Sequence, residues 1–261
     1  MREYQENFIN IYDNFKDSSN RLRKAGKFNY ILKKLGVHDP GGICLDTGCS
    51  NGIITNSLSP LFKHVIGVDI DLTALHLLQE SEAQNISYAF GDAMALPFEK
   101  ESFEAVVCSQ TYEHVPSSAQ LFGEIDRVLK EDGVLIFSGP NKTFPIEPHY
   151  YLPFLHWFNE RTADAYLRMT RKGTHYYERS RTYWDLKRVF ACYEIIDVIK
   201  YVLEYYAETS PKGISRWANK VASKLPIIVL RILSPFMVNI NWILIKKENF
   251  ANGRKKIKFA T

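Results

Sequence analysis

The sequence predicts an α/β fold built on a doubly wound, mostly parallel sheet, and two observations lead to this prediction. From Gly42 on, short apolar runs alternate with helical stretches, which is the pattern of successive strand-helix-strand units. The first apolar run passes directly into a glycine-containing turn and then into a helix. Together the short apolar runs and the helical stretches between them indicate a buried parallel sheet.

Length and composition exclude several classes of protein. The chain has 261 residues, of which 46% are hydrophobic and 24% charged, as in an average globular protein. Its four cysteines are too few and too scattered for a disulfide framework, and no C-x-x-C pair indicates zinc. We therefore expect reduced thiols and no metal site. Residues 1–7 are polar and acidic, unlike a secretion signal, so we expect a cytoplasmic protein.

The first 140 residues are expected to hold N-terminal helices and a cofactor-binding core. Helical apolar spacing indicates two helices within residues 1–40, separated near Asp17. In the core, residues 41–140, we expect strands near 42–46, 64–69, 86–90, 104–109 and 133–138. Helices are expected near 52–60, 72–81 and 117–130, and Gly133 fits a position just past the end of the last one.

The remaining residues complete what we predict to be a single domain. Residues 141–181 form an insertion between the fifth and sixth strands, dense in aromatic side chains and containing three histidines. We expect it to cover a substrate pocket, because loops at strand ends carry function in such sheets. Residues 182–261 should hold a helix near 182–190, strands near 193–202 and 238–246, the last one antiparallel, and a basic amphipathic segment.

The first strand runs into the sharpest motif of the chain. After the apolar residues 43–45 come Asp46, Gly48, Cys49 and Gly52, at the start of the next helix. Close backbone approach and helix N–H groups would make this turn a cradle for a nucleotide or a carboxylate. An ordinary tight turn between strand and helix is the alternative. The glycine spacing differs from G-x-G-x-x-G and argues against NAD.

Acidic residues follow the next two strands. Asp69 ends the second strand, where a carboxylate can accept two hydrogen bonds from a ribose diol. Asp92 follows the third strand and suits the exocyclic amine of an adenine, with apolar neighbours to cover the ring. Each aspartate alone could instead cap a helix or form a turn. Three strand-end features in this order favour a cofactor site.

With these motifs the chain resembles the class I S-adenosylmethionine-dependent methyltransferases, which have a Rossmann-like fold. The resemblance covers about 42–140 and also includes Leu96-Pro97-Phe98 after Asp92, and Glu113-His114-Val115 after the fourth strand. It implies S-adenosyl-L-methionine as the cofactor. The residues that it implies for cofactor binding are Asp46, Gly48, Cys49, Gly52, Asp69, Ile70, Asp92, Ala93, Ser109 and Gln110.

The resemblance implies a different role in cofactor binding for each group of these residues. Asp46 and Gly48 would shape the loop, and Gly52 would let the methionine end approach. Asp69 would bind the ribose, while Ser109 or Gln110 would border the sulfonium. The chain departs from the family pattern at Ser50, where a glycine is usual, and we expect tighter packing there.

Methyl transfer from a sulfonium mainly requires that the acceptor be aligned and stripped of water. A hydroxyl acceptor also needs a base, and His114 is the predicted one because its ordinary pKa is near neutral. Glu113 and His114 could instead only cap and orient the next helix. Further candidates for a base or for acceptor binding are His149, Tyr150 and His175.

The acceptor is predicted to be a small or lipid-linked molecule, methylated at oxygen. No Asn/Asp-Pro-Pro-Tyr/Phe run follows the fourth strand, which argues against an amino group on nucleic acid or glutamine. Nucleic acid is therefore not expected as a partner. A non-catalytic cofactor-binding module and an RNA methyltransferase remain as alternatives.

The C-terminal part of the chain is strongly basic. From Lys212 on there are eleven basic residues and one acid, so the +4 net charge hides an acidic body. Within 214–233, basic and apolar side chains fall on adjacent stripes of a helical wheel, typical of a helix that lies on an anionic membrane. Docking of the apolar stripe on the protein itself is the alternative. Pro226 should interrupt the helix, and Arg231 splits the apolar run too early for a transmembrane span.

Overall fold

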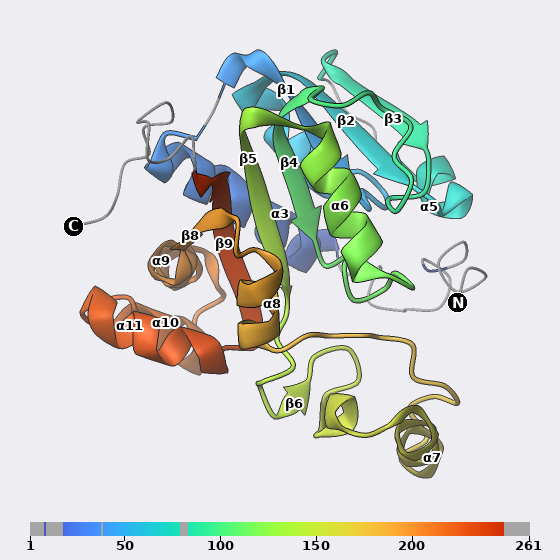
Figure 1. Ribbon diagram of the computed structural model, residues 1–261. Coiled ribbons are helices and arrows are strands. Elements are labelled where there is room, and N and C mark those ends of the chain that lie inside the picture. The colour runs from blue at the N-terminus through green and yellow to red at the C-terminus, as the bar shows by residue number, and fades with distance from the viewer. Residues whose placement is uncertain (1–7, 9–17, 38, 79–82, 248–261) are drawn as a thin grey trace.

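A seven-stranded sheet forms the centre of the computed structural model, which describes residue 8 and residues 18–37, 39–78 and 83–247 (Figure 1). The strand order is β3-β2-β1-β4-β5-β9-β8. Strands β3, β2, β1, β4 and β5 are parallel, and β9 is antiparallel to both of its neighbours. Their bounds are β1 (Asp39–Thr47), β2 (Phe62–Asp69), β3 (Ile86–Phe90), β4 (Phe103–Ser109), β5 (Leu129–Pro140), β8 (Tyr193–Asp197) and β9 (Asn239–Lys246). The predicted fold class is confirmed.

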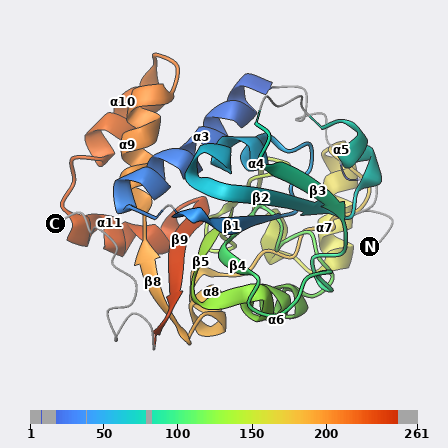
Figure 2. The same cartoon turned by 90° about the horizontal axis from the view of Figure 1, so that it is seen from above.

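Helices cover both faces of this sheet (Figure 2). One face carries α3 (Ser18–Leu35), α4 (Ile53–Leu58) and α9 (Ile199–Thr209), and the other carries α6 (Ser118–Val128) and α8 (Tyr183–Val189). Short elements at the ends of strands are η2 (Ser59–Leu61) and α5 (Leu72–His76). The chain is therefore layered helix, sheet, helix, as a doubly wound fold requires.

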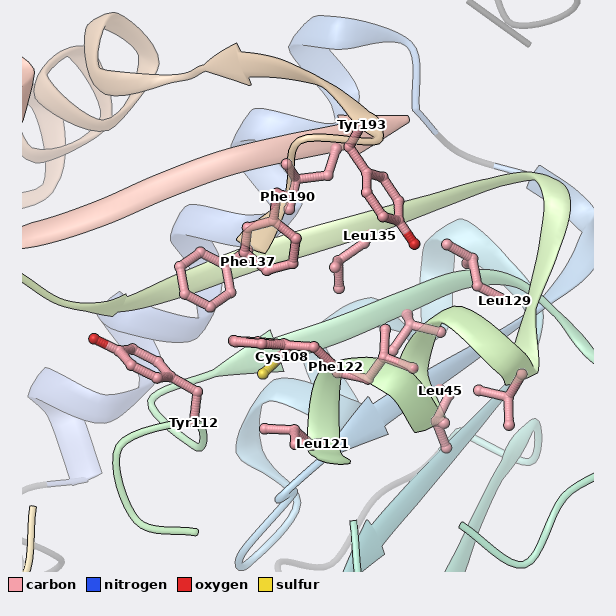
Figure 3. Packing of buried hydrophobic residues seen from close by; sticks show 14 of the residues in the cluster. Leu45, Cys108, Tyr112, Leu121, Phe122, Leu129, Leu135, Phe137, Phe190 and Tyr193 are labelled. Atoms are coloured by element: carbon pink, nitrogen blue, oxygen red, sulfur yellow. The ribbon is translucent and has the colours of Figure 1, made fainter. Parts of the chain in front are cut away.

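Alternate residues of each strand enter opposite halves of the core. Leu45 and Leu135 pack with Phe122 of α6 and with Phe190 (Figure 3), whereas Cys44 belongs to the cluster beneath α3. Successive strand side chains point to opposite faces, so a strand buried on both faces must be apolar at every position. This is why central stretches such as 134–137 of β5 are visible in the sequence as uninterrupted apolar runs.

The junction between α6 and β5 differs from the prediction. Helix α6 ends at Val128, the next residue is already extended, and Gly133 lies inside β5 rather than just past a helix. A Cβ atom at Gly133 would lie 2.6 Å from the Leu129 side chain. The register of β5 against β4 shifts between the Phe103 and Ala105 pairs, and the glycine fits this irregular stretch. The helix-end prediction for Gly133 is therefore wrong.

The strand predicted near 193–202 is also partly wrong, because β8 stops at Asp197 and α9 begins at Ile199. The Asp197 carboxylate accepts a hydrogen bond from the backbone N–H of Ile199 at 3.0 Å, which supports the start of the helix. Val198 is buried beneath α3, with Val202 packed against the same cluster. The β-branched side chains after Asp197, which favour strands, are part of a helix here, because tertiary packing overrides the local propensity.

The helices predicted for residues 1–40 are described only in part. Helix α3 is a single element that begins at Ser18, close to the predicted break. The other helix falls on residues outside the described part of the chain, apart from Phe8.

The insertion lies beyond the carboxyl end of β5 (Figure 1). It contains the hairpin of β6 (Ile146–Glu147) and β7 (Leu152–Pro153), then η3 (Leu155–Trp157) and α7 (Glu160–Met169). Its four buried apolar residues form a cluster of their own: Leu152, Leu155, Ala163 and Leu167. The insertion therefore has its own small core next to the sheet.

The basic segment forms two helices, α10 (Ile214–Ala222) and α11 (Ile227–Leu233), followed by η4 (Ser234–Phe236). Pro226 stands at the N-cap of α11, so the predicted interruption is confirmed. Helix α10 packs along α9.

Candidate active site

The loop between β1 and α4 is held against β2 by backbone hydrogen bonds. The N–H groups of Gly48 and Cys49 both donate to the Val68 carbonyl, at 2.8 and 3.1 Å. Asp46 is almost fully buried and accepts a hydrogen bond of 2.7 Å from the Thr55 hydroxyl, and burial raises the pKa of Asp46 to about 7. Neither Asp46 nor the buried Cys49 reaches the surface of the loop. Both would therefore serve a cofactor by shaping the loop.

Two glycines of this loop adopt the left-handed conformation, with φ of 71° at Gly48 and 77° at Gly52. A Cβ atom at Gly48 would lie 2.6 Å from the Thr111 hydroxyl, and one at Gly52 would overlap the Tyr88 hydroxyl. Sequence reasoning missed Tyr88. The only signal is its place in β3, directly opposite Gly67, whose missing side chain leaves room for the tyrosine ring.

Ser50, the departure from the family pattern, also adopts the left-handed conformation, with φ of 50°. Its backbone N–H donates to Asp69 Oδ2 at 2.7 Å, and the N–H of Asp71 donates to Asp69 Oδ1 at 2.8 Å. Within the described residues, the buried atoms Ser50 Oγ and Asn51 Oδ1 have no hydrogen-bond partner. Orphaned polar atoms of this kind are costly unless a ligand or water satisfies them.

The other cofactor residues expected from the sequence lie at the same edge of the sheet. Asp69 and Ile70 are at the end of β2, Asp92 and Ala93 follow β3, and Ser109 and Gln110 are at the end of β4. Asp92 Oδ1 accepts from the N–H of Met94 at 2.8 Å, and Ala93 packs against the core. Gln110 has a φ of 56°, and its N–H donates to the Ser138 carbonyl. Carboxyl ends of parallel strands that meet at one edge are where ligands bind in such sheets.

These residues fit S-adenosylmethionine. Each Asp69 oxygen accepts one backbone hydrogen bond and keeps lone-pair capacity for a ribose hydroxyl. Burial raises the pKa of Asp69, while the backbone N–H groups of Asp71 and Ser50 favour its charged form. The orphaned atoms of Ser50 and Asn51 supply polar contacts in the loop itself.

A second polar cluster follows β4. Glu113 is fully buried, and its Oε1 atom lies 3.6 Å from Nε2 of His114 and 3.9 Å from Nε2 of His149. His149 belongs to the insertion, and its Nδ1 is 2.7 Å from Oε1 of the fully buried Glu147. The His114 ring packs against Phe8, with centroids 4.5 Å apart, and against the edge of His149 at 5.1 Å. The fold thus brings two of the predicted base candidates, His114 and His149, into contact.

Burial and neighbouring charges shift the pKa values of the three side chains of this cluster in different directions. Burial raises the pKa of Glu113 to about 8 and holds that of His114 well below its ordinary value. Burial also lowers the pKa of His149, but the hydrogen bond to Glu147 and the charges of Glu147 and Glu178 outweigh it and raise that pKa to about 9. The two histidines of the cluster therefore differ, because the pKa of His114 is lowered and that of His149 is raised.

The cluster does not cap the following helix. The N-cap of α6 is Ser117, whose hydroxyl accepts from the N–H of Gln120 at 3.3 Å. The part of the alternative in which Glu113 and His114 cap this helix is therefore wrong. Instead the carbonyl of Glu113 accepts from the N–H of Arg179 at 2.8 Å, which ties the cluster to the end of the insertion.

A cavity of about 460 Å³ lies in the insertion beside this cluster. Its lining includes Lys142, His156, Phe158, His175, Glu178 and Arg179. His175 Nδ1 is 2.7 Å from Asp164 Oδ2, so this candidate belongs to the cavity and not to the cluster around Glu113. Tyr150 packs edge-on against Tyr176, with ring centroids 6.0 Å apart.

The sequence is similar to a known protein family and to curated methyltransferases. Residues 45–137 match the family model described as a methyltransferase domain. The ubiquinone biosynthesis O-methyltransferase of Glaesserella parasuis is 29% identical over 165 residues, which are 58% of this chain and 66% of that protein. The enzyme of the same name from Paraburkholderia phytofirmans is 31% identical over 148 residues, 55% of this chain and 60% of that protein. The chain thus matches less than two thirds of the length of these curated relatives.

Solved structures share the fold at low sequence identity. The crystal structure of MccD protein has a TM-score of 0.54 at 16% identity and covers 85% of this chain and 96% of its own. The crystal structure of the [4+2]-cyclase SpnF has a TM-score of 0.53 at 17% identity and covers 85% of this chain and 81% of its own.

The sheet order, the loop after β1 and the acids at the strand ends define a class I methyltransferase fold. Residues 45–137 form a methyltransferase domain of the class I S-adenosylmethionine-dependent type, with S-adenosylmethionine as its cofactor. The resemblance seen in the sequence is confirmed.

Proposed function

We propose that the protein transfers the methyl group of S-adenosylmethionine to a hydroxyl oxygen of a small-molecule acceptor. The observation that carries this proposal is the cluster of the buried Glu113 and the partly buried His114 and His149, which forms just after the strand that ends in Ser109. Groups that can handle a proton thus lie at the same sheet edge as the cofactor loop. The names of the curated relatives, which are O-methyltransferases, support an oxygen acceptor.

Fold alone would not justify this reaction, because the similar SpnF structure is described as a [4+2]-cyclase. A module that only held the cofactor would also not need a buried carboxylate next to two histidines after β4. Burying Glu113 costs free energy, and strongly perturbed carboxylates and histidines are typical of active sites. The cluster therefore favours catalysis over simple binding.

Each part of the site has a task in the proposed reaction. Asp69 and the loop at Ser50 would hold the cofactor, which supplies an electrophilic methyl group when bound. Positioning the acceptor against it contributes roughly 7–11 kcal/mol to lowering the barrier. The neutral imidazole of His114 would take the proton of the hydroxyl, while Phe8 shields it from water.

We further propose that the acceptor carries an apolar or lipid-linked part that contacts the insertion. Four large apolar side chains there are strongly exposed: Tyr151, Phe154, Trp157 and Phe158. The cavity next to them combines aromatic walls with two basic residues, Lys142 and Arg179, and two acidic ones, Glu160 and Glu178. Such a lining suits an aromatic or prenylated molecule with a polar end.

This function is tested by incubating the purified protein with S-adenosylmethionine and a panel of hydroxylated aromatic compounds, with and without a prenyl tail. We expect S-adenosylhomocysteine to form only with a hydroxylated acceptor, and faster with the prenylated one. A search for metabolites heavier by one methylene in cells that carry the gene would identify the natural acceptor. Cofactor binding without turnover on any acceptor, and no such metabolite, would favour the binding-module alternative.

We also propose that α10 and α11 rest on an anionic lipid surface. Ile214, Trp217, Ile228 and Ile232 are between 64% and 87% exposed, so these side chains are not docked on the described body of the protein. The buried Leu230 anchors α11 to the body. Apolar side chains beside exposed basic ones suit the boundary between acyl chains and phosphate headgroups.

The basic residues of this surface are not all equivalent. Lys220, Lys224 and Arg231 are exposed, whereas Arg216 donates through Nε to the Ala207 carbonyl at 2.9 Å and so ties α10 to α9. Within residues 18–37, 39–78 and 83–247, no helix combines the length and the apolar character needed to cross a bilayer.

A further inference from the structure

We propose that Glu113, His114 and His149 bind one divalent transition-metal ion, which contacts the acceptor oxygen of the reaction proposed above. One ligand atom from each side chain lies within 4.8 Å of the other two. His149 comes from the insertion, far along the chain from Glu113 and His114, so spacing in the sequence gave no sign of the cluster. This proposal departs from our sequence-based expectation of no metal site.

The distances suit a metal site after a small movement. Glu113 Oε1 is 3.6 Å from Nε2 of His114 and 3.9 Å from Nε2 of His149. Ligand atoms that each lie about 2.0–2.2 Å from one zinc-like ion are roughly 3.0–3.5 Å from each other. The two Glu113 distances therefore need to shorten by a few tenths of an ångström, and the two histidine nitrogens, within 4.8 Å of each other, must also approach by side-chain rotation.

His149 is oriented in the way that metal-binding histidines usually are. Its Nδ1 faces Glu147 Oε1 at 2.7 Å, which leaves Nε2 directed at Glu113 and His114. Glu147 is itself held in place, because its Oε2 accepts the backbone N–H groups of His149 and Tyr150, both at 2.8 Å. A carboxylate behind the imidazole fixes the tautomer and strengthens the ligand.

Glu113 supplies an independent sign that a cation belongs here. Its side chain is fully buried, and neither carboxylate oxygen has a hydrogen bond within the described residues. Two further carboxylates, Glu147 and Glu178, are also buried and act electrostatically on His149. The ionised form of a buried carboxyl group without hydrogen bonds is unfavourable unless a cation lies beside it, and a divalent ion would stabilise that form of Glu113.

The donor set indicates the kind of ion and its task. Two imidazole nitrogens and one carboxylate oxygen favour zinc, iron, cobalt or manganese over magnesium or calcium. Three protein ligands leave coordination positions open for the acceptor. A hydroxyl bound to such an ion is far more acidic than a free one, so the ion would replace His114 as the group that activates the acceptor.

The experiment uses the full chain after treatment with a chelator and dialysis. We expect calorimetric titration with Zn²⁺ and with Mn²⁺ to show one site, and elemental analysis of the reloaded and dialysed protein to find one ion per chain. The variants Glu113→Gln and His149→Gln should weaken binding by more than about tenfold, and Glu147→Gln by about 10–100-fold. His64→Gln is the matched control, because His64 lies on β2, hydrogen-bonded to Ser87, and should bind the ion as the wild type does.

Cobalt substitution gives a readout that a merely structural role would not produce. The wild type should acquire the visible absorption of coordinated Co²⁺, and His149→Gln should lose it while still binding S-adenosylmethionine. Retained cofactor binding shows that the variant is folded. Absence of binding for both ions, or equal binding by the wild type and His149→Gln, would overturn the metal site. Failure of the proposed methyl transfer is read separately, as absence of S-adenosylhomocysteine.

Discussion

Asp69 at the end of β2 accepts a hydrogen bond of 2.7 Å from the backbone N–H of Ser50 in the loop after β1. The same carboxylate accepts from Asp71 through its other oxygen. One side chain therefore joins the loop to the second strand and also offers its remaining lone pairs to a ligand. This double use explains how the loop keeps its shape with a serine where the family has a glycine.

Replacing Asp69 with alanine should weaken cofactor binding by about 1–3 kcal/mol, because charge-assisted hydrogen bonds are lost. Calorimetric titration with S-adenosylhomocysteine measures the change. Asp132→Ala removes an exposed acid of β5 and is the control, for which we expect wild-type affinity. Equal affinities in both variants would exclude the ribose role of Asp69.

Gly52→Ala should destabilise the fold and weaken cofactor binding. The left-handed φ of 77° costs a residue with a Cβ about 1–2 kcal/mol, and overlap with the Tyr88 hydroxyl adds to this. Adding Tyr88→Phe removes the overlapping oxygen and should restore part of the free energy of unfolding. Urea denaturation of the four proteins in a double-mutant cycle gives the coupling, and strictly additive effects would contradict the contact.

His114→Ala should lower turnover by roughly 10²–10⁴ and leave cofactor affinity near that of the wild type. The measurement requires an identified acceptor and single-turnover kinetics. His64→Ala is the control, because His64 lies near the start of β2 and is hydrogen-bonded to Ser87; its turnover should equal that of the wild type. If bound metal is lost in the same variant, His114 acts as a ligand; if metal is retained, it acts as the base. Unchanged turnover per folded molecule would make its role structural.

The stability of the protein should depend on pH through Lys27. Burial and the nearby charge of Lys24 lower the pKa of Lys27 from 10.5 to about 7, although its amine donates to Asn241 at 2.7 Å. Between these two pKa values the unfolded chain binds a proton that the native state has released, so stability rises with pH by up to about 1.4 kcal/mol per unit.

Lys27→Met should therefore raise the free energy of unfolding at pH 7 and below, and this gain should shrink as the pH rises towards 10.5. Urea denaturation over that range provides the measurement. Lys33→Met, at an exposed position of the same helix, should show no such trend. A gain that stays constant with pH would show that Lys27 is charged in the native state throughout.

The surface formed by α10 and α11 should bind vesicles that contain anionic lipid. Each of Lys220, Lys224 and Arg231 should contribute about 1 kcal/mol, and Trp217→Ala with Ile228→Ser should weaken the binding further. Flotation assays measure this. Salt should reduce binding without abolishing it, because apolar burial is not screened. RNA binding would instead fall steeply with salt and survive both substitutions.

Wild-type protein that stays at the bottom of the gradient would end the membrane proposal. Leu233→Ser offers a comparison, since this side chain is only 38% exposed and its loss should affect folding more than lipid binding.

The central sheet was readable from the sequence because both of its faces are buried. Every position of strands such as 134–137 must then be apolar, and such a run stands out without knowledge of its neighbours. The position of Asp69 and Asp92 could also be predicted from the sequence. Parallel strands place their carboxyl ends at the same edge of the sheet, and this does not depend on how the helices between them pack.

Contacts between distant segments were decided only by the tertiary structure. Tyr88 fills the space above Gly52, and His149 reaches Glu113 from the insertion, through side-chain positions that no local pattern encodes. The residues after Asp197 show the same effect, because branched side chains typical of a strand are buried just as well by a helix packed beneath α3. Hydrophobic burial is not directional, so the sequence determined which residues are buried, and the fold determined which partners they meet.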